Sequence, residues 1–191
     1  MSVQDERVET FRALHAKGCF VMPNPWDVGS ARALAGLGFP ALATTSAGLA
    51  WTHGLTDGHI TLEHALDHLR AVAGAVEVPV NADLEGGYAV DPDEVHENVR
   101  RAVATGVAGL SIEDASGDRD SPLLDLALAV DRIRAARRAI DETRTGVVLT
   151  ARSEGFVVGR PDLDETVRRL KAYAEAGADC LYAPRIETRE Q

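Results

Sequence analysis

Acidic side chains and one arginine follow successive short apolar runs of the sequence, at the points where those runs end. One run leads into Asp83 and Glu85, the next into Glu113, and the one after that into Arg152. In α/β proteins the carboxyl ends of parallel strands meet on one side, so these side chains are expected to project into a single cleft. Carboxylate oxygens are the ligands that Mg²⁺ prefers. The pattern therefore predicts a magnesium site with an arginine beside it.

A second interpretation of the same acids is structural, because Asp83 and Glu113 could cap the helices that follow them. Recurrence of acids at equivalent places favours the metal site, and so does the pair Gly86-Gly87, which lets a ligand approach the backbone. Thr44-Thr45-Ser46-Ala47-Gly48 ends another run and is predicted to form a polar loop of the same cleft.

Four histidines gather in one stretch and raise a zinc alternative. His64 and His68 stand one helical turn apart, a spacing that can bind zinc. Both lie off the apolar stripe of their segment, however, and no His-Glu-x-x-His motif is present. A solvated helix face is the interpretation that the sequence favours for them.

The elements that must position these residues alternate regularly along the chain. Short apolar runs predict six strands: Cys19–Met22, Ala41–Thr44, Val78–Ala82, Gly109–Ile112, Val147–Thr150 and Cys180–Ala183. Amphipathic segments predict a helix before the first run and one in each interval. Some have readable ends, since Thr61 and Asp91 are natural N-caps and Pro92 suits a first helical position. In the last segment, Leu163, Val167, Leu170 and Ala174 are predicted to face inward.

A weak internal repeat favours one arrangement of these units. Gly38, Gly106 and Gly177 each stand four residues before a leucine of a predicted strand, at intervals of 68 and 71 residues. Those intervals are twice a unit of about 35 residues, the size that a (β/α)₈ barrel repeats, although an open doubly wound sheet also alternates in this way. Eight units would need roughly 275 residues. We therefore expect a barrel truncated after its sixth strand.

Length, composition and charge limit the classes of protein. The chain has 191 residues, 45% of them hydrophobic, and a formal net charge of −10. We expect a single domain, 1–191, and the acidic balance argues against nucleic acid and anionic membranes as partners. Residues 1–18 carry charges and no apolar segment, so a cytoplasmic location is expected. Ala33–Thr56 lacks charge, but its glycines and Pro40 predict a buried strand with a polar loop rather than a membrane span.

Five motifs, in register from about Phe20 to Ala183, resemble the isocitrate lyase / phosphoenolpyruvate mutase superfamily. They are Asn24-Pro25-Trp26-Asp27-Val28-Gly29-Ser30-Ala31-Arg32, Thr45-Ser46-Ala47-Gly48, Asp83-x-Glu85-Gly86-Gly87-Tyr88, Ser111-Ile112-Glu113-Asp114 and Ala151-Arg152-Ser153-Glu154. The resemblance implies a (β/α)₈ barrel of the TIM type, Mg²⁺ (with Mn²⁺ as an alternative), and small 2-oxo or 2-hydroxy acid substrates. It also implies that a C–C or C–P bond is cleaved or made through an enolate.

The resemblance also implies roles for individual residues. Asp83, Glu85 and Glu113 match the metal-side carboxylates, and Asp57 matches an acid near the metal waters. Ser46, Ala47 and Gly48 match a segment whose backbone N–H groups bind the substrate carboxylate or enolate oxygen. Arg152 matches an arginine that clamps the same anion. Asp114 and Glu154 stand beside matched residues and are expected to hold them in place.

Departures from the family pattern narrow the expected activity. Where the isocitrate and methylisocitrate lyases carry a Lys-Lys/Arg-Cys-Gly-His loop, this chain has Ala115 to Pro122, without cysteine or lysine. We expect a Mg²⁺-dependent lyase that cleaves a C–C bond of a small 2-oxo or 2-hydroxy (di)carboxylic acid, similar to oxaloacetate decarboxylase or methylisocitrate lyase. The alternatives are C–P chemistry, as in phosphonopyruvate hydrolase or the mutase, and a non-catalytic truncated member that serves as a binding or assembly module. Open sheet edges predict a homo-oligomer.

Overall fold

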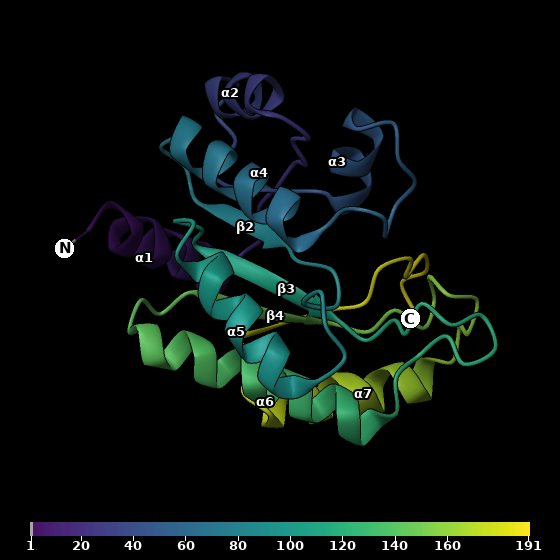
Figure 1. Cartoon of the computed structure of the whole chain (residues 1–191). Helices are drawn as coiled ribbons and strands as arrows, with labels where there is room; N and C mark the ends of the chain where they lie inside the picture. The colour runs from purple at the N-terminus through teal and green to yellow at the C-terminus, as the bar shows by residue number, and fades with distance from the viewer. Residues whose placement is uncertain (1) are drawn as a thin grey trace.

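The fold is a curled, parallel, five-stranded sheet, as a computed structural model that describes residues 2–191 shows. Its strands are β1 (Leu42–Ala43), β2 (Val80–Asp83), β3 (Gly109–Glu113), β4 (Val148–Arg152) and β5 (Cys180–Tyr182). Each strand pairs only with its neighbours in the chain, in the order β1-β2-β3-β4-β5. This order has no reversal point, which excludes the open doubly wound alternative. The predicted fold class, a truncated (β/α)₈ barrel, is confirmed (Figure 1).

Seven helices accompany the sheet within the described residues. They are α1 (Val3–Ala16), α2 (Val28–Gly36), α3 (Ser46–Thr52), α4 (Leu62–Ala75), α5 (Pro92–Val103), α6 (Leu126–Thr143) and α7 (Leu163–Glu175). Thr61 and Asp91 cap α4 and α5 as predicted, because their side-chain oxygens accept hydrogen bonds from backbone N–H groups of the first turn. None of these helices is long and apolar enough to cross a membrane.

The first predicted strand, Cys19–Met22, is wrong. That segment is irregular, and its contact with the sheet is made by Pro23, whose carbonyl accepts a hydrogen bond from the Ala43 N–H at 3.1 Å. Pro23 and Pro25 have no N–H to donate, so a continuous ladder cannot form along this segment. The chain therefore forms five strands where six were predicted.

The segment after β1 also differs from the prediction. A polar loop was expected from Thr44 to Gly48, but α3 begins at Ser46. Thr45 is its N-cap, and the Thr45 Oγ1 accepts a hydrogen bond from the Gly48 N–H at 3.2 Å. The prediction read Gly48 as a helix breaker and missed the cap three residues before it.

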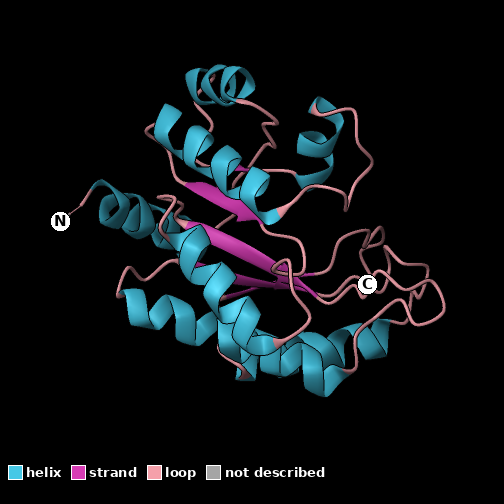
Figure 2. Cartoon of the chain, in the orientation of Figure 1, coloured by secondary structure: helices cyan, strands magenta, loops and turns pink. Residues whose placement is uncertain are grey.

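The two faces of the sheet have opposite chemistry. Residues on the outer face are apolar and buried beneath the helices: Leu42, Val80, Ala82, Leu110, Ile112, Leu149 and Ala151. Figure 2 shows the helices arranged around the strands. On the concave face, strand pairing places Asp83 opposite Ser111 and Glu113 opposite Arg152. Because side chains alternate along a strand, the same strands that build the core present polar groups to the barrel interior.

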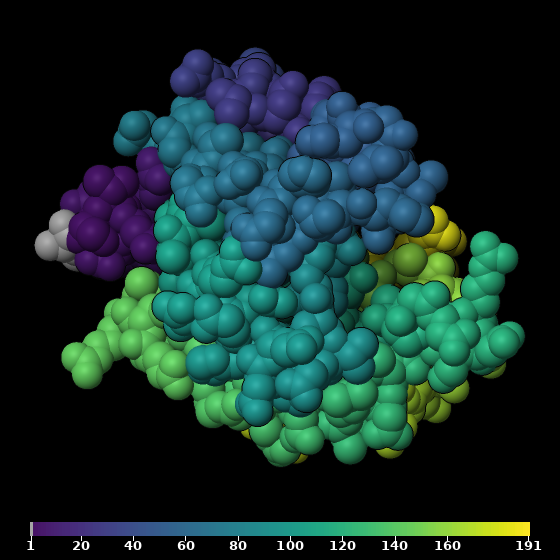
Figure 3. All heavy atoms as spheres, viewed as in Figure 1, coloured from purple at the N-terminus to yellow at the C-terminus, as the bar shows by residue number. Residues whose placement is uncertain are grey.

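Helix α1 closes the end of the half-barrel at which the strands begin. Its Phe11 is fully buried, and a Cβ on Gly109 would lie 2.5 Å from the Phe11 Cε1. Gly109 thus leaves the space that lets α1 approach β3. The space-filling view shows α1 packed at the side of the molecule and α2, α3 and α4 packed against one another (Figure 3).

Helix α7 presents a different face from the one predicted. Its buried residues are Thr166, Arg169 and Tyr173, whereas Val167 is 41% exposed. The reason is polar: Arg169 and Tyr173 both bind the buried carboxylate of Asp114 at the end of β3. These long-range bonds orient the helix against its apolar pattern.

Candidate active site

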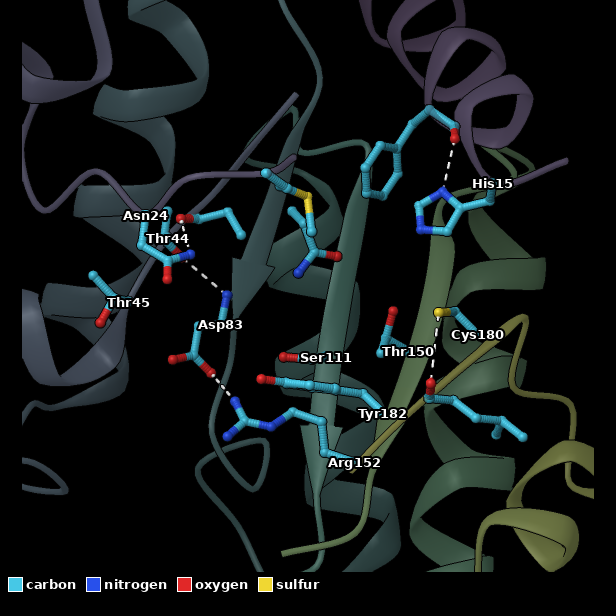
Figure 4. A pocket seen from close by; sticks show the side chains of 15 residues that line it. His15, Asn24, Thr44, Thr45, Asp83, Ser111, Thr150, Arg152, Cys180 and Tyr182 are labelled. Atoms are coloured by element: carbon cyan, nitrogen blue, oxygen red, sulfur yellow. Dashed lines mark hydrogen bonds and ion pairs between the residues drawn. The ribbon is translucent and has the colours of Figure 1, made fainter. Parts of the chain in front are cut away.

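The concave face of the sheet lines a cavity of about 430 Å³ that runs from Phe11 and His15 of α1 to the side where the strands end. Its wall includes Thr44 and Thr45 from the β1 end, Asp83 from β2, and Arg152 from β4. Figure 4 shows Asp83 and Arg152 joined across the cavity, with Asn24 and Thr45 on one side and Thr150 and Cys180 on the other. The four strand ends predicted to converge therefore do converge.

Arg152 lies at the centre of the acidic residues. Its Nη1 is 2.9 Å from the Asp83 Oδ1, and its Nη2 is 3.3 Å from the Glu113 Oε2 and 3.0 Å from the Glu154 Oε1. All four side chains are less than one fifth exposed. The guanidinium is thus fixed by three carboxylates contributed by β2 and by the ends of β3 and β4.

The cluster holds more negative than positive charge. Burial raises the pKa of Glu113 to about 8, and Glu154, Asp83 and Glu85 add to that rise while Arg152 opposes it. Burial acts to lower the pKa of Arg152, but its neighbouring carboxylates, Asp83 first, raise it overall. Three carboxyl groups contact one guanidinium, with Glu85 beside them, and the raised pKa of Glu113 means that a proton offsets part of their negative charge near neutral pH.

Asp83 also organises the start of α3. Its Oδ2 accepts a hydrogen bond from the Ser46 N–H at 2.9 Å, and its own N–H donates to the Thr44 Oγ1 at 2.9 Å. The predicted substrate-binding segment Ser46–Gly48 is therefore tied directly to a predicted metal ligand. Within it, the Ser46 and Gly48 N–H groups already have acceptors, on Asp83 and Thr45.

Glu85 sits in a strained turn beside the cluster. It has a positive φ of 48°, and Tyr88 one of 57°, conformations that are uncommon for residues other than glycine. The Tyr88 hydroxyl donates to the Glu85 Oε1 at 3.0 Å. Burial raises the pKa of Glu85, and the charge of Asp57 contributes to the rise. Asp57 itself is exposed, on the loop between α3 and α4, outside the cluster around Arg152.

Asp114 and Glu154 support the cluster around Arg152 through hydrogen bonds, as expected. The Asp114 Oδ1 accepts a hydrogen bond from the Glu154 N–H at 2.8 Å. Its Oδ2 accepts from the Tyr173 hydroxyl at 2.6 Å and from the Arg169 Nη1 at 3.2 Å. Sequence reasoning missed Tyr173 and Arg169, because no local pattern marks a residue whose partner is about 55 positions away.

The capping interpretation of Asp83 and Glu113 is wrong. Asp91 caps α5 and Asp125 caps α6, in each case through side-chain hydrogen bonds to the first turn. Asp83 and Glu113 instead direct their carboxylates toward Arg152. Neither acid caps the helix that follows it in the chain, although Asp83 binds the Ser46 N–H at the start of α3.

The structure also bears on the four histidines, for which a zinc site and a solvated helix face were the two interpretations. His53 and His64 stack at 5.6 Å between ring centroids. The Nε2 of His68 is buried without a hydrogen-bond partner, so the predicted solvated face does not hold for that residue. Burial lowers the pKa of His68. In residues 2–191 no group of three or more His, Cys, Asp and Glu side chains has the arrangement of a metal site.

The acidic cluster fits Mg²⁺ in its chemistry, since the donors are oxygens and their charge exceeds that of Arg152. Its geometry is that of an arginine-centred ion cluster, because Arg152 lies between the carboxylates of Asp83 and Glu113. A cation at this place would neutralise carboxylates that are buried beyond what one arginine can balance.

Comparison with protein families places these features in context. Residues 11–191 match the model of the phosphoenolpyruvate phosphomutase family. The chain belongs to this family and to the isocitrate lyase / phosphoenolpyruvate mutase superfamily, as the motifs predicted. The superfamily contains lyases and mutases.

Curated relatives cover most of this chain. An uncharacterized protein of Mycobacterium tuberculosis (strain ATCC 25618 / H37Rv) is 35% identical over 92% of the chain and 65% of its own length. The 2-methylisocitrate lyase of Escherichia coli (strain K12) is 31% identical over 78% of the chain and 52% of its own length. An oxaloacetate decarboxylase of Bradyrhizobium diazoefficiens is 28% identical over the whole chain and 67% of the relative.

Solved structures share the fold closely. A Burkholderia cenocepacia J2315 protein described as a lyase or mutase superposes with a TM-score of 0.96 at 47% identity, over 98% of this chain and 68% of that one. A phosphonopyruvate hydrolase in complex with oxalate and Mg²⁺ superposes with a TM-score of 0.87 at 26% identity, over 95% and 64%. The chain thus spans about two thirds of the length of these proteins.

Proposed function

We propose that this chain carries the metal-binding and anion-binding part of a Mg²⁺-dependent lyase that cleaves a C–C bond of a small 2-oxo or 2-hydroxy (di)carboxylic acid. The observation that carries the proposal is Arg152, which lines the cavity and is held at the strand ends by Asp83, Glu113 and Glu154. The named relatives include lyases and a decarboxylase whose names specify substrates of this class.

Asp83, Glu85 and Glu113 are the proposed holders of the cation, directly or through water, with Asp57 near its waters. Their oxygens suit Mg²⁺ and also Mn²⁺. When bound, the cation supplies Lewis-acid stabilisation of negative charge on a substrate oxygen. A related phosphonopyruvate hydrolase has been solved in complex with oxalate and Mg²⁺, which supports the choice of this cation and of a small dicarboxylate as ligand.

Arg152 is the proposed anion clamp of the reaction. When the C3–C4 bond of a 2-oxo dicarboxylic acid such as oxaloacetate breaks, C4 leaves as CO₂ and the electron pair forms the C2–C3 double bond of an enolate, with the negative charge on the 2-oxo oxygen. Protonation of C3 from solvent then gives the 2-oxo acid product. A guanidinium already fixed by three carboxylates need not reorganise as that charge grows, and such preorganised stabilisation is usually the largest catalytic term. The α3 segment Ser46–Gly48, whose Ser46 N–H binds the same Asp83 carboxylate as Arg152, is the proposed second contact to the anion.

The segment from Ala115 to Pro122 favours a reaction that needs little help from a protein acid or base. It forms a small closed loop, with Ala115 bridged to Leu123 and the Ser116 Oγ donating to the Ser121 carbonyl. It presents no cysteine or lysine to act as a proton donor or acceptor. Decarboxylation, which needs no base to take a hydroxyl proton, therefore fits better than isocitrate-type retro-aldol cleavage, and C–P chemistry remains the second candidate because the family includes mutases.

The test is an assay of oxaloacetate, 2-alkylmalates and phosphonopyruvate with and without Mg²⁺, followed by release of pyruvate or another 2-oxo acid. The expected result is metal-dependent turnover of a 2-oxo or 2-hydroxy dicarboxylate that Arg152→Met abolishes and the exposed-site control Arg70→Met retains. Metal-dependent turnover of the phosphonate alone would favour the second candidate. Absence of turnover across the panel, together with absence of Mg²⁺ binding, would leave the non-catalytic binding module as the better account.

Self-association is a further part of the proposal. Within residues 2–191, β1 and β5 form the two edges of the sheet, and edge strands offer backbone groups for pairing with another chain. We expect a homo-oligomer in light scattering. A stable, well-folded monomer at all concentrations would contradict this expectation.

A further inference from the structure

Arg132 of α6 is a charged side chain enclosed within the protein, with only 2% of its surface exposed. Its guanidinium donates to three backbone carbonyls: those of Gly86, Ala89 (2.9 Å) and Glu113 (3.2 Å). Gly86 and Ala89 belong to the loop after β2, and Glu113 ends β3. One side chain therefore joins two segments that carry proposed metal ligands.

No carboxylate among residues 2–191 forms an ion pair with Arg132, in contrast to the enclosed arginines Arg152 and Arg169. Arg152 pairs with three acids, and Arg169 pairs with Asp114 and Glu165. A buried charge without a counter-charge is costly, so it persists only where fixed dipoles solvate it. Here the three carbonyls do so for the Nη1 and Nη2 groups, while the buried Nε has no hydrogen-bond partner. The cost argues that the arginine is present for more than packing.

The carbonyls that Arg132 binds are those that set the direction of the neighbouring carboxylates. Gly86 follows Glu85 directly, and the Glu113 carbonyl belongs to a ligand residue itself. A backbone hydrogen bond from the Glu113 N–H to the Glu85 carbonyl, at 3.1 Å, ties the same two segments together. Arg132 and this bond thus act on one junction, between the positive-φ turn at Glu85 and the end of β3.

Gly86 shows how close this approach is. A Cβ at Gly86 would lie 3.0 Å from the Arg132 Nη2, tighter than ordinary van der Waals contact. Its φ does not lie in the left-handed region, so the backbone conformation does not itself demand glycine. Glycine at position 86 therefore leaves the space that the Arg132 guanidinium occupies. This explains why the first residue of the Gly86-Gly87 pair is glycine.

We propose that Arg132 is a positioning residue that fastens the loop after β2 to the end of β3 and so fixes the separation and direction of the Glu85 and Glu113 carboxylates. It touches neither substrate nor cation. The expected effect of Arg132 on metal affinity rests on the proposed function. Its role in fastening the loop after β2 does not. The two parts can therefore be tested separately.

The fastening is tested by amide hydrogen exchange on the metal-free chain, comparing wild type with Arg132→Lys and Arg132→Met. Arg134→Met is the matched control, because Arg134 lies on the same helix and is exposed. We expect exchange at the Glu113 amide and across residues 86–89 to quicken at least tenfold in Arg132→Met and less in Arg132→Lys, which keeps the charge but cannot reach three carbonyls. The Leu149 amide, which Asp179 binds at the opposite end of the sheet, should keep its wild-type rate.

A purely structural role would speed exchange uniformly with the loss of global stability, and that result would overturn the proposal. Should Arg132→Met fail to fold, Arg132→Lys and Gly86→Ala decide the question by the same amide readout. Unchanged exchange at Glu113 in both would also overturn it.

Calorimetric titration with Mg²⁺ measures the functional consequence. Loss of a group that orients metal ligands typically weakens affinity about 10- to 100-fold. We expect a loss in this range for Arg132→Met, a smaller one for Arg132→Lys, and none for Arg134→Met. If the wild type binds no Mg²⁺, the proposed function fails while the exchange result still decides the positioning role. Wild-type affinity in Arg132→Met would show that the fastening has no effect on the metal site and would overturn that part.

Discussion

The two ends of the sheet use charge in opposite ways. At the end where the strands begin, one acid serves two arginines: Asp179 accepts from Arg12 at 3.2 Å, from Arg137 at 3.0 Å and from the Leu149 N–H at 2.9 Å. At the end where the strands finish, three carboxylates surround one arginine, with Glu85 beside them. The first end is electrostatically satisfied by the protein alone, whereas the second is short of positive charge.

Backbone strain follows this division only in part. Before the strands, positive φ angles fall on glycines, among them the repeat glycines Gly38, Gly106 and Gly177, but also on Arg144 (φ 56°) ahead of β4. After β2 they fall on Gly87 and on two residues other than glycine, Glu85 and Tyr88, where they cost free energy. In barrel proteins the end where strands begin commonly serves stability and the other end serves chemistry. The half-barrel keeps this separation.

The largest loss of unfolding free energy is expected for Arg152→Met, at the end where the strands finish. Removing the single cation would leave three buried carboxylates facing one another, and loss of one partner of a buried ion pair costs about 3 kcal/mol or more. We expect urea unfolding to show a loss of this size. Arg12→Met, at the other end of the sheet, should cost less than half as much, because that arginine is 43% exposed. Equal losses at the two ends would refute the contrast.

A smaller effect is expected from Tyr173→Phe, which acts on the support of the acidic end. The Tyr173 hydroxyl donates to the buried Asp114 carboxylate, and a hydrogen bond to a charged group contributes about 2 kcal/mol. The half-exposed Tyr182 gives the matched control, Tyr182→Phe, for which no measurable change in unfolding free energy is expected. A neutral Tyr173→Phe would mean that Asp114 is held well enough by Arg169 and Glu154 alone.

The smallest effect is expected from Asp179→Asn, at the satisfied end. Its ion pairs are partly solvated and its bond to Leu149 can be kept by the amide oxygen, so a loss of about 1 kcal/mol is expected. Mg²⁺ affinity, measured by calorimetry, should equal that of the wild type. A change in metal affinity here would show that the two ends are coupled through β4 and β5.

Local signals in the sequence predicted the elements well. Thr61, Asp91 and the three repeat glycines each act on neighbouring backbone, so their residue types alone indicate where helices begin and end. The convergence of Asp83, Glu113 and Arg152 was predictable for a related reason: strand pairing carries equivalent positions to one edge.

Features that depend on distant partners were not predictable. The inward face of α7 is set by Asp114, and Arg132 is recognised only by the carbonyls that it binds, which every residue possesses. The segment Cys19–Met22 has a strand-like composition, but the prolines beside it lack the donors that a ladder requires. For α7 and Arg132 an interaction outside the sequence window outweighs the local pattern, whereas Pro23 and Pro25 are local signals against a strand.

The central claim is that the acid-rich end of the half-barrel binds a divalent cation, and calorimetric titration of the metal-free chain with Mg²⁺ tests it most directly. The account predicts saturable binding that Asp83→Ala weakens at least tenfold and that Asp67→Ala, at a carboxylate 78% exposed on α4, leaves unchanged. Absence of saturable binding in the wild type, or equal binding in the two variants, would contradict it.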